Sequence, residues 1–326
     1  MRIGINPEKL EPKKLIHKPH RVIIPIYIPN LEEEYFKNAL EVLKICLDSL
    51  LATTNSQQTN ITIINNASCD EVSNVLEDYF YKGDIDKLVQ LKENRGKVEP
   101  VLSEAMSSFE EYITISDADV LFRNGWLFYT MQLFDTFPKV GVVAPLPSPH
   151  LYSYCNSSCI VDNFLSGKIK YGTVVKKNTL KEFEKSIGSS LMQSYYDTQY
   201  YIQKHNVKAL LGAGHFIATY KNFFRYSVDK KVPYVFANGL EKTFIDDVAE
   251  KFGMWRLSTT EAYVYHMGNT IIDSTQIKKD IDNSTRFFKY KKLKSTTKIK
   301  YRVQTIFYKI IMKILKKQSL KVNKCS

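Results

Sequence analysis

Residues 112–122 read YITISDADVLF, and this stretch decides the predicted fold. Its first residues are apolar or β-branched, as is typical of a buried strand, and Asp117 and Asp119 follow at once. A turn here aims both carboxylates, or one directly and one through a ribose or water, at a divalent cation. Mg²⁺ and Mn²⁺ prefer such oxygen ligands and share them with substrate phosphates. Asp-x-Asp is frequent by chance, so its position after a strand is what favours a metal site.

Outward from this stretch, predicted strands alternate with predicted helices through residue 144. The strands are expected at 21–30, 61–66, 87–91 and 111–116, and the helices at 31–51, 70–80 and 98–109. This alternation predicts an α/β fold with a mostly parallel central sheet flanked by helices. Ligands of such sheets bind at the carboxyl ends of the strands. Those ends carry polar clusters at 27–30, 65–70, 93–96 and 117–119.

The pattern is less regular beyond residue 144. A helix is predicted over the tyrosine-rich segment 189–205, and a glycine-rich turn followed by a strand over 211–220. A further helix is expected at 244–253. Asp246 and Asp247 stand at its start, where carboxylates either complement the helix dipole or accept a proton from a hydroxyl. A strand at 262–266 ends in a histidine, which is more often structural than a ligand.

The order of these parts resembles the family 2 glycosyltransferases, which are inverting enzymes of the GT-A fold. The resemblance covers about residues 20–270 and is moderately specific as a whole, although each piece is weak alone. The matching pieces are VIIPIYIPN, IINNASCD, ENRGKVEPVLSEA, YITISDADVLF, GAGHFIAT, IDDVAEKFG and VYHMG.

The resemblance implies a role for each matching side chain. Asp119 and His266 would bind Mn²⁺ or Mg²⁺, and Asp247, in preference to Asp246, would be the general base. The nucleotide would be contacted by Pro25, Tyr27, Asn66, Asp70, Arg95 and Asp117. The alternative for Arg95 is that its side chain is simply solvated at the turn. The sugar and acceptor would be bordered by Trp126, Gly212, Gly214 and His215. The alternative for Trp126 is that its ring packs in the interior at the start of a helix.

One departure from the family pattern concerns recognition of the base. Family members commonly have an aspartate pair after the second strand, whereas this chain has Asn65 and Asn66, followed by Asp70. An amide oxygen still accepts the imide N–H of uracil, but it is neutral and the amide also offers donors. A UDP-sugar is therefore the expected donor, with a glycan or lipid-linked acceptor and a single inverting displacement in surface polysaccharide assembly.

Two other functions remain open. A nucleotidyltransferase has a related sheet and also binds phosphates through a metal, but it favours a glycine-rich, basic loop after the first strand. YIPNLEEE, residues 27–34, is neither. A non-enzymatic basic adaptor for membranes or nucleic acid would keep its catalytic residues only as vestiges.

The positive charge of the chain lies in its tail. Residues 283–326 contain 14 Lys and Arg and no Asp or Glu, while the other 282 residues hold 32 basic and 34 acidic side chains. A near-neutral body argues against nucleic-acid binding. In the tail, Ile299, Val303, Ile306, Ile310 and Ile314 recur at helical spacing beside lysines, which predicts an amphipathic helix lying on an anionic membrane. A helix docked on the body is the alternative.

These observations divide the chain into four segments. They are an N-terminal lead-in (1–20), a nucleotide-sugar-binding half (21–144), an acceptor-binding half of the same domain (145–282) and the basic amphipathic tail (283–326). Five scattered cysteines, the absence of an apolar leader and the lack of a long apolar stretch indicate a reduced, cytoplasmic location at the inner membrane face. Cys155 and Cys159 lack the second ligand pair of a zinc site.

Overall fold

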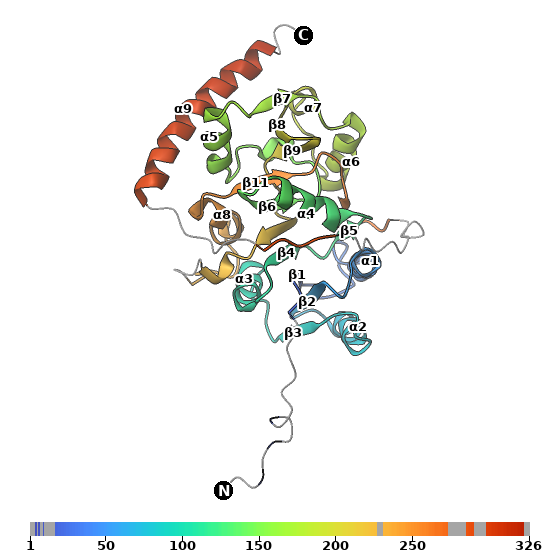
Figure 1. Cartoon of the computed structure of the whole chain (residues 1–326). Helices are drawn as coiled ribbons and strands as arrows, with labels where there is room; N and C mark the ends of the chain where they lie inside the picture. The colour runs from blue at the N-terminus through green and yellow to red at the C-terminus, as the bar shows by residue number, and fades with distance from the viewer. Residues whose placement is uncertain are drawn as a thin grey trace.

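The computed structural model describes residues 17–226, 231–272, 285–289 and 298–322, together with positions 4, 6 and 9. Within the last range, side chains are described for residues 303–315. Figure 1 shows the arrangement of the helices and strands.

A ten-stranded sheet runs through the described part of the chain, in the order β3-β2-β1-β4-β10-β6-β11-β9-β8-β7. A second sheet pairs β5 with β12. The strands are β1 (His20–Ile26), β2 (Thr59–Asn66), β3 (Lys87–Leu91), β4 (Tyr112–Ser116), β5 (Val120–Phe122), β6 (Val140–Ala144), β7 (Lys170–Gly172), β8 (Gln199–Lys204), β9 (Val207–Leu211), β10 (Ile217–Lys221), β11 (Trp255–Ser258) and β12 (Val264–His266).

The helices connect and cover these strands. They are α1 (Ala39–Thr53), α2 (Asp70–Tyr81), α3 (Val98–Ser107), α4 (Trp126–Thr136), α5 (Ser157–Leu165), α6 (Lys177–Ile187), α7 (Ser194–Asp197), α8 (Val248–Lys251) and α9 (Lys298–Val322). Short 3₁₀ turns lie at Pro149–Leu151 and Phe224–Tyr226, and a π-helical turn, Lys242–Asp246, precedes α8.

The N-terminal half of the sheet is parallel, as predicted. β1 lies between β2 and β4, β3 follows β2, and all of these pairs are parallel. β2 and β4 are buried along almost their whole length, because helices on both sides of the strands leave no face in water. Since these strands run the same way, their last residues all lie at one edge of the sheet. These residues are Ile26, Asn66, Leu91 and Ser116.

The sheet as a whole is mixed. β10 lies antiparallel between β4 and β6, and β11 pairs parallel with β6. β9, β8 and β7 then continue the sheet in antiparallel pairs. The α/β fold class is confirmed. The boundary between the two predicted halves at 144/145 stays a prediction, because one continuous sheet crosses it.

Two predicted helices differ in the structure. The helix expected at 31–51 begins only at Ala39, because Asn30 Oδ1 accepts hydrogen bonds from the backbone N–H groups of Glu32 and Glu33 and holds a turn there. The helix expected over 189–205 is wrong: after the short α7, the chain forms β8, which turns at His205 into β9. His205 and Asn206 form the two-residue turn of this hairpin, with His205 at φ +52°.

His20 is buried at the start of β1. Its ring nitrogens contact Thr59 Oγ1 at 3.0 Å and Thr114 Oγ1 at 2.7 Å, and its ring lies against Phe287. Burial lowers the pKa of His20 to about 3, outweighing the nearby Glu110 carboxylate. The folded protein therefore holds this imidazole neutral where an unfolded chain would protonate it.

We expect a pH-dependent loss of stability from His20. Because the folded pKa lies below the ordinary value of 6.5, the unfolded chain takes up the proton first as the pH falls, and stability decreases between pH 6.5 and pH 3. From pH 7.5 to pH 5 the contribution is about 2 kcal/mol. Urea unfolding of the wild type and of His20→Gln at both pH values measures it. An equal pH dependence in the two proteins would show that His20 is not the source.

Candidate active site

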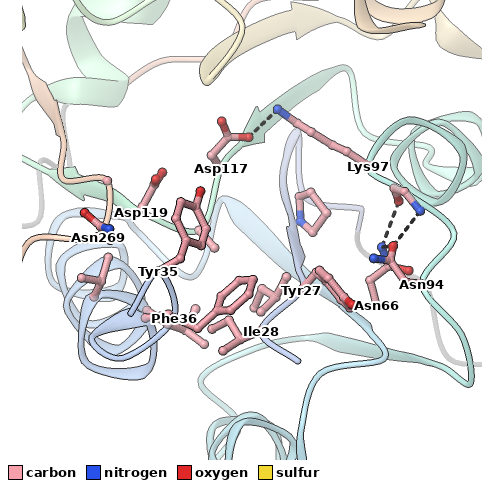
Figure 2. A pocket seen from close by; sticks show the side chains of 18 of the residues that line it. Tyr27, Ile28, Tyr35, Phe36, Asn66, Asn94, Lys97, Asp117, Asp119 and Asn269 are labelled. Atoms are coloured by element: carbon pink, nitrogen blue, oxygen red, sulfur yellow. Dashed lines mark hydrogen bonds and ion pairs between the residues drawn. The ribbon is translucent and has the colours of Figure 1, made fainter. Parts of the chain in front are cut away.

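A cavity of about 390 Å³ opens at the edge of the sheet where the parallel strands end (Figure 2). Its lining comes from the end of β1, the turn before α1, the loop before α3, the loop after β4 and the segment after β12. The lining residues include Pro25, Tyr27, Tyr35, Phe36, Asn66, Asn94, Gly96, Lys97, Asp117, Asp119, Phe236 and Asn269. Segments from both halves of the chain thus meet in one cleft.

The Asp-x-Asp pair, Asp117 and Asp119, lines this cavity. The backbone N–H of Asp117 donates to Phe216 O at 2.7 Å, and Met267 N donates to Asp119 O at 2.8 Å. These bonds tie the loop after β4 to the strands that follow it in space, β10 and β12. The two carboxylates therefore have a defined orientation, and they differ in their partners.

Asp119 has the features of a metal ligand. His266 Nε2 lies 3.3 Å from its Oδ2, while Oδ1 is buried with no hydrogen-bond partner among the described residues. Burial raises the pKa of Asp119, the Asp117 charge adds to this, and His266 opposes it. A buried carboxylate oxygen without a donor fits a cation, and a carboxylate with an imidazole is a donor set that Mn²⁺ accepts. No group of three or more such ligands occurs among the described residues.

Asp117 faces a cation supplied by the protein. Its carboxylate pairs with Lys97 Nζ, and Lys97 also lies 2.7 Å from Glu241 Oε1 (Figure 2 shows the first pair). Burial opposes the charge on Lys97, but the two carboxylates outweigh it and raise its pKa. Lys97 is thus a permanently charged ammonium group at the wall of the cavity, held between two acids that lie far apart in the chain.

Glu241 and His215 extend this network away from the cavity. His215 Nε2 lies 3.6 Å from Glu241 Oε2, and its Nδ1 lies 3.7 Å from Asp246 Oδ2. Glu241 directly precedes the π-helical turn Lys242–Asp246. It is partly exposed, so its carboxylate can meet a second substrate that enters beside the cavity.

Asp246 is enclosed in the protein interior, where its carboxylate is hydrogen-bonded to other side chains. Both Asp246 and Arg256 are 0% exposed, and Arg256 Nη2 donates to Asp246 Oδ1 at 2.9 Å. Tyr154 donates to the other carboxylate oxygen at 3.0 Å, and Arg256 Nη1 donates to the Asp246 backbone oxygen. A carboxylate enclosed in this way has no free path to a substrate hydroxyl.

Asp247 is half-buried and lies outside the cavity lining. Burial raises its pKa, and the positive charges of Lys251, Lys242 and Arg256 oppose this. The charges that act on Lys97 are instead those of Asp117 and Glu241. Of Asp246, Asp247 and Glu241, only Glu241 forms an ion pair, within the described part of the chain, with a residue that lines the cavity, Lys97.

The expected nucleotide contacts divide into two groups. Pro25 and Tyr27 line the cavity as predicted, as does Asn66. Asp70 instead begins α2 at an exposed position, and the Arg95 side chain pairs with Glu99 at 3.4 Å, so neither lines the cavity. Asp70 opens a helix in solvent, and the guanidinium of Arg95 is held by the Glu99 carboxylate.

Asn66 holds a turn in place. Its amide donates to Asn94 Oδ1 at 2.9 Å and to Gly96 O at 3.0 Å, and its oxygen accepts the N–H of Arg95 at 2.9 Å. Gly96 has φ +72°, and a Cβ there would lie 2.1 Å from Val235 O. The turn therefore needs both the amide and the glycine, and the expected contact of Asn66 with the base stays a prediction.

The expected sugar and acceptor contacts are mostly buried. Trp126 is 0% exposed and its Nε1 donates to Thr54 Oγ1 at 3.2 Å, so it is the packed helix start and not a sugar platform. Gly212 and Gly214 are also buried, and a Cβ on Gly212 would lie 2.4 Å from Leu151 O. His215 is the exposed member of this group.

Sequence reasoning missed Tyr35, Phe36, Lys97 and Glu241. Tyr35 and Phe36 were assigned to a helix, whereas the turn after Asn30 presents them to the cavity. Lys97 lay inside the quoted piece ENRGKVEPVLSEA, where a lysine after a glycine turn was an available signal for an anionic ligand. No local pattern marked Glu241.

Fold and site together define an α/β protein whose parallel strands end at a cavity with an Asp-x-Asp pair, a lysine and a nearby histidine. Residues 34–154 match the family model of Glycosyl transferase family 2. The resemblance predicted from the sequence is confirmed over this segment.

Curated relatives match over a limited stretch. Poly-β-1,6-N-acetyl-D-glucosamine synthase of Staphylococcus epidermidis is 30% identical over 110 residues, which is 34% of this chain and 26% of that protein. A second sequence of the same name from this organism is 29% identical over 110 residues. The match thus covers about a quarter of the length of these relatives.

Solved structures are similar to this chain at low sequence identity, and one of them is named as a mannosyltransferase. S. aureus TarS 1–349 is 14% identical, with 76% of this chain and 60% of that chain covered and a TM-score of 0.45. Mannosyltransferase PcManGT from Pyrobaculum calidifontis, in complex with GDP-Man and Mn²⁺, is 15% identical, with 74% and 55% covered and a TM-score of 0.43.

Proposed function

We propose that this protein is an inverting glycosyltransferase that uses a nucleotide diphosphate sugar. The observation that carries the proposal is the placement of both Asp-x-Asp carboxylates and Lys97 on one cavity at the carboxyl edge of the parallel strands. The family 2 segment supports this function over a nucleotidyltransferase or a non-enzymatic adaptor.

The donor in this proposal is a UDP-sugar. Tyr27, directly after β1, offers an exposed ring on which the base would stack. The Asp117 carboxylate lines the same cavity and would accept a hydrogen bond from a ribose hydroxyl. Lys97 supplies positive charge for the diphosphate. The curated relatives are named as synthases of an N-acetylglucosamine polymer, which favours a hexosamine donor and surface polysaccharide as the product class.

The metal in this proposal is Mn²⁺ or Mg²⁺, held by Asp119 and His266. The donor diphosphate and water would complete its ligands, since the described residues offer only these two groups beside Asp117. When bound, the cation neutralises charge on the diphosphate as that group leaves.

The displacement needs a base at the acceptor. We place Glu241 in this role, in preference to the Asp247 expected from the sequence, because Glu241 contacts Lys97 at the cavity wall. The acceptor oxygen bonds to the anomeric carbon while the bond from that carbon to the diphosphate breaks, and the bonding pair leaves with the diphosphate. The hydroxyl proton passes to the Glu241 carboxylate. Attack opposite the leaving group inverts the anomeric configuration.

The acceptor in this proposal is a glycan or a lipid-linked glycan, handled at the cytoplasmic face of a membrane. His215, which lies beside Glu241 and is exposed, borders the path by which it would enter. No helix in the described ranges is both long and apolar enough to cross a bilayer.

Donor binding is tested by thermal shift with UDP-GlcNAc, UDP-Glc, UDP-Gal and GDP-Man, each with and without Mn²⁺. One of the UDP-sugars should raise the Tm by roughly 5 °C at hundredfold excess over its Kd, and only with the metal present. Asp119→Asn should remove most of this shift. Asp84→Asn, an exposed aspartate between α2 and β3, is the matched control and should retain it.

Two results would count against the donor proposal. The first is that no nucleotide sugar stabilises the wild type with Mn²⁺ present. The second is that Asp119→Asn keeps the full metal-dependent shift, which would remove Asp119 from the metal site even if a donor binds.

A further inference from the structure

Helix α9 lies along α5 on the outer surface of the C-terminal half (Figure 1). Ile311 and Leu315 of α9 are buried in the main core, and Tyr308 donates to Ser153 O at 3.2 Å. Tyr200 of β8 donates to the Leu315 carbonyl at 3.3 Å. These contacts hold α9 at one rotation about its own axis, so the direction of every other face of its described part is defined.

A second apolar row of α9 points away from this contact. Its side chains are between 40% and 60% exposed and follow the spacing i, i+3, i+4, i+7 and i+11. They are Val303, Ile306, Phe307, Ile310 and Ile314. A continuous apolar row of this kind is unusual on the surface of a monomeric soluble protein, and it marks a surface that is covered by something else.

Positive charge borders this row on the side away from α5. Lys309 and Lys313 lie three residues after Ile306 and Ile310, next to the row on the helix surface, and both are exposed. The whole helix, Lys298–Val322, has eight Lys and Arg and no Asp or Glu. The occupant of the surface must therefore be apolar at its centre and negatively charged at its border.

A bilayer with anionic lipids meets both requirements. Acyl chains accept the apolar row while headgroup phosphates face the lysines, and the helix can lie in the plane of the interface. A second copy of the chain would bring one set of lysines against another. Nucleic acid would satisfy the lysines but would leave five apolar side chains in water.

We propose that the exposed row of α9, bordered by Lys309 and Lys313, inserts into the headgroup region of an anionic bilayer. Because α9 is docked on α5, the membrane would bind the body in one orientation. This inference goes beyond the transferase proposal and does not depend on it, since lipid binding requires neither a donor nor a metal.

The test is co-sedimentation of the full chain with lipid vesicles. Vesicles of phosphatidylcholine with about a third phosphatidylglycerol should bind the wild type, and pure phosphatidylcholine should bind it at least tenfold more weakly, because each Lys or Arg near an anionic surface contributes about 1 kcal/mol. Ile306→Glu/Ile310→Glu should weaken binding to the anionic vesicles at least tenfold. The control Tyr81→Glu/Tyr171→Glu adds the same charge at two exposed aromatic residues elsewhere and should bind normally.

A second pair of variants addresses charge without touching the apolar row. Lys309→Glu/Lys313→Glu should also weaken binding at least tenfold, whereas Lys82→Glu/Lys92→Glu, with the same change in net charge at exposed sites of the N-terminal half, should not. Circular dichroism and Tm identify any variant that has lost its fold. The Lys309/Lys313 pair then decides the question if the Ile306/Ile310 pair unfolds.

Three results overturn the inference. They are failure of the wild type to bind anionic vesicles, equal losses in the α9 variants and their controls, and a wild-type dimer in light scattering that Ile306→Glu/Ile310→Glu dissociates while lipid binding stays unchanged. Thermal shift with nucleotide sugars, measured without lipid, reports separately on the transferase proposal.

Discussion

Replacing Glu241 with Gln should lower the turnover number about a thousandfold and leave the Kd of the donor within about threefold of wild type. The turnover falls because an amide cannot accept the acceptor proton, and a lost general base typically costs 10²- to 10⁴-fold, roughly. The donor still binds because a glutamine oxygen can keep the contact with Lys97 Nζ, which is 2.7 Å in the wild type. Lys97 and Asp117 therefore stay in place.

The experiment measures kcat and KM for transfer, together with the Kd of the donor by titration. Asp247→Asn is the discriminating variant, because the sequence favoured that residue as the base. Glu261→Gln, at an exposed glutamate whose partner is Lys176 at 3.1 Å, is the matched control. Full turnover in Glu241→Gln, combined with a thousandfold loss in Asp247→Asn, would return the role of base to Asp247.

A positioning role for Glu241 would give different kinetics from a role as general base. If Glu241 acted only by positioning Lys97, Glu241→Gln, which keeps that contact, would leave kcat nearly unchanged, whereas Glu241→Ala and Lys97→Gln would each raise the KM of the donor more than they lower kcat. A loss confined to kcat places Glu241 at the reacting hydroxyl.

Replacing Asp246 with Asn should lower the free energy of unfolding by about 3–5 kcal/mol. Asp246 and Arg256 are both 0% exposed, and their charged hydrogen bond is 2.9 Å long. Removing the carboxylate charge leaves the guanidinium in the interior without a counter-charge. A loss of this size can reduce the amount of folded protein at 37 °C, so activity has to be compared per folded molecule.

Urea unfolding of wild type and Asp246→Asn measures this effect. Glu41→Gln is the matched control, because Glu41 also pairs with a base, Lys44 at 2.7 Å, but in a solvent-exposed position. Such a pair contributes about 0–1 kcal/mol. A stable Asp246→Asn protein with no turnover would contradict the structural role and restore Asp246 as a catalytic candidate.

Much of the N-terminal half could be predicted because its signals are local. The strands ending at Asn66, Leu91 and Ser116 are short apolar runs followed by polar turns, and their bounds agree closely with the structure. Parallel strands with helical connections bring their carboxyl ends to one edge, so the meeting of Tyr27, Asn66 and the Asp-x-Asp pair followed from the pattern alone.

Burial, by contrast, was poorly predicted from residue type. Trp126 and Gly212 were expected beside a sugar, and both lie in the interior. An aromatic or glycine residue is equally suited to a ligand site and to close packing, and only the neighbouring segments decide between the two. The same holds for Asn66, whose amide is taken up by the turn at 94–96.

The sequence by itself determined the α/β class, the parallel half of the sheet, the position of the Asp-x-Asp pair and the basic, amphipathic character of the tail, because each depends on spacing within a single segment. The tertiary structure alone decided that Glu241 meets Lys97, that Asp246 is enclosed with Arg256, and which face of α9 is covered. These are contacts between segments far apart in the chain, and nothing in the local order of residues specifies which of many possible partners a folded side chain will reach.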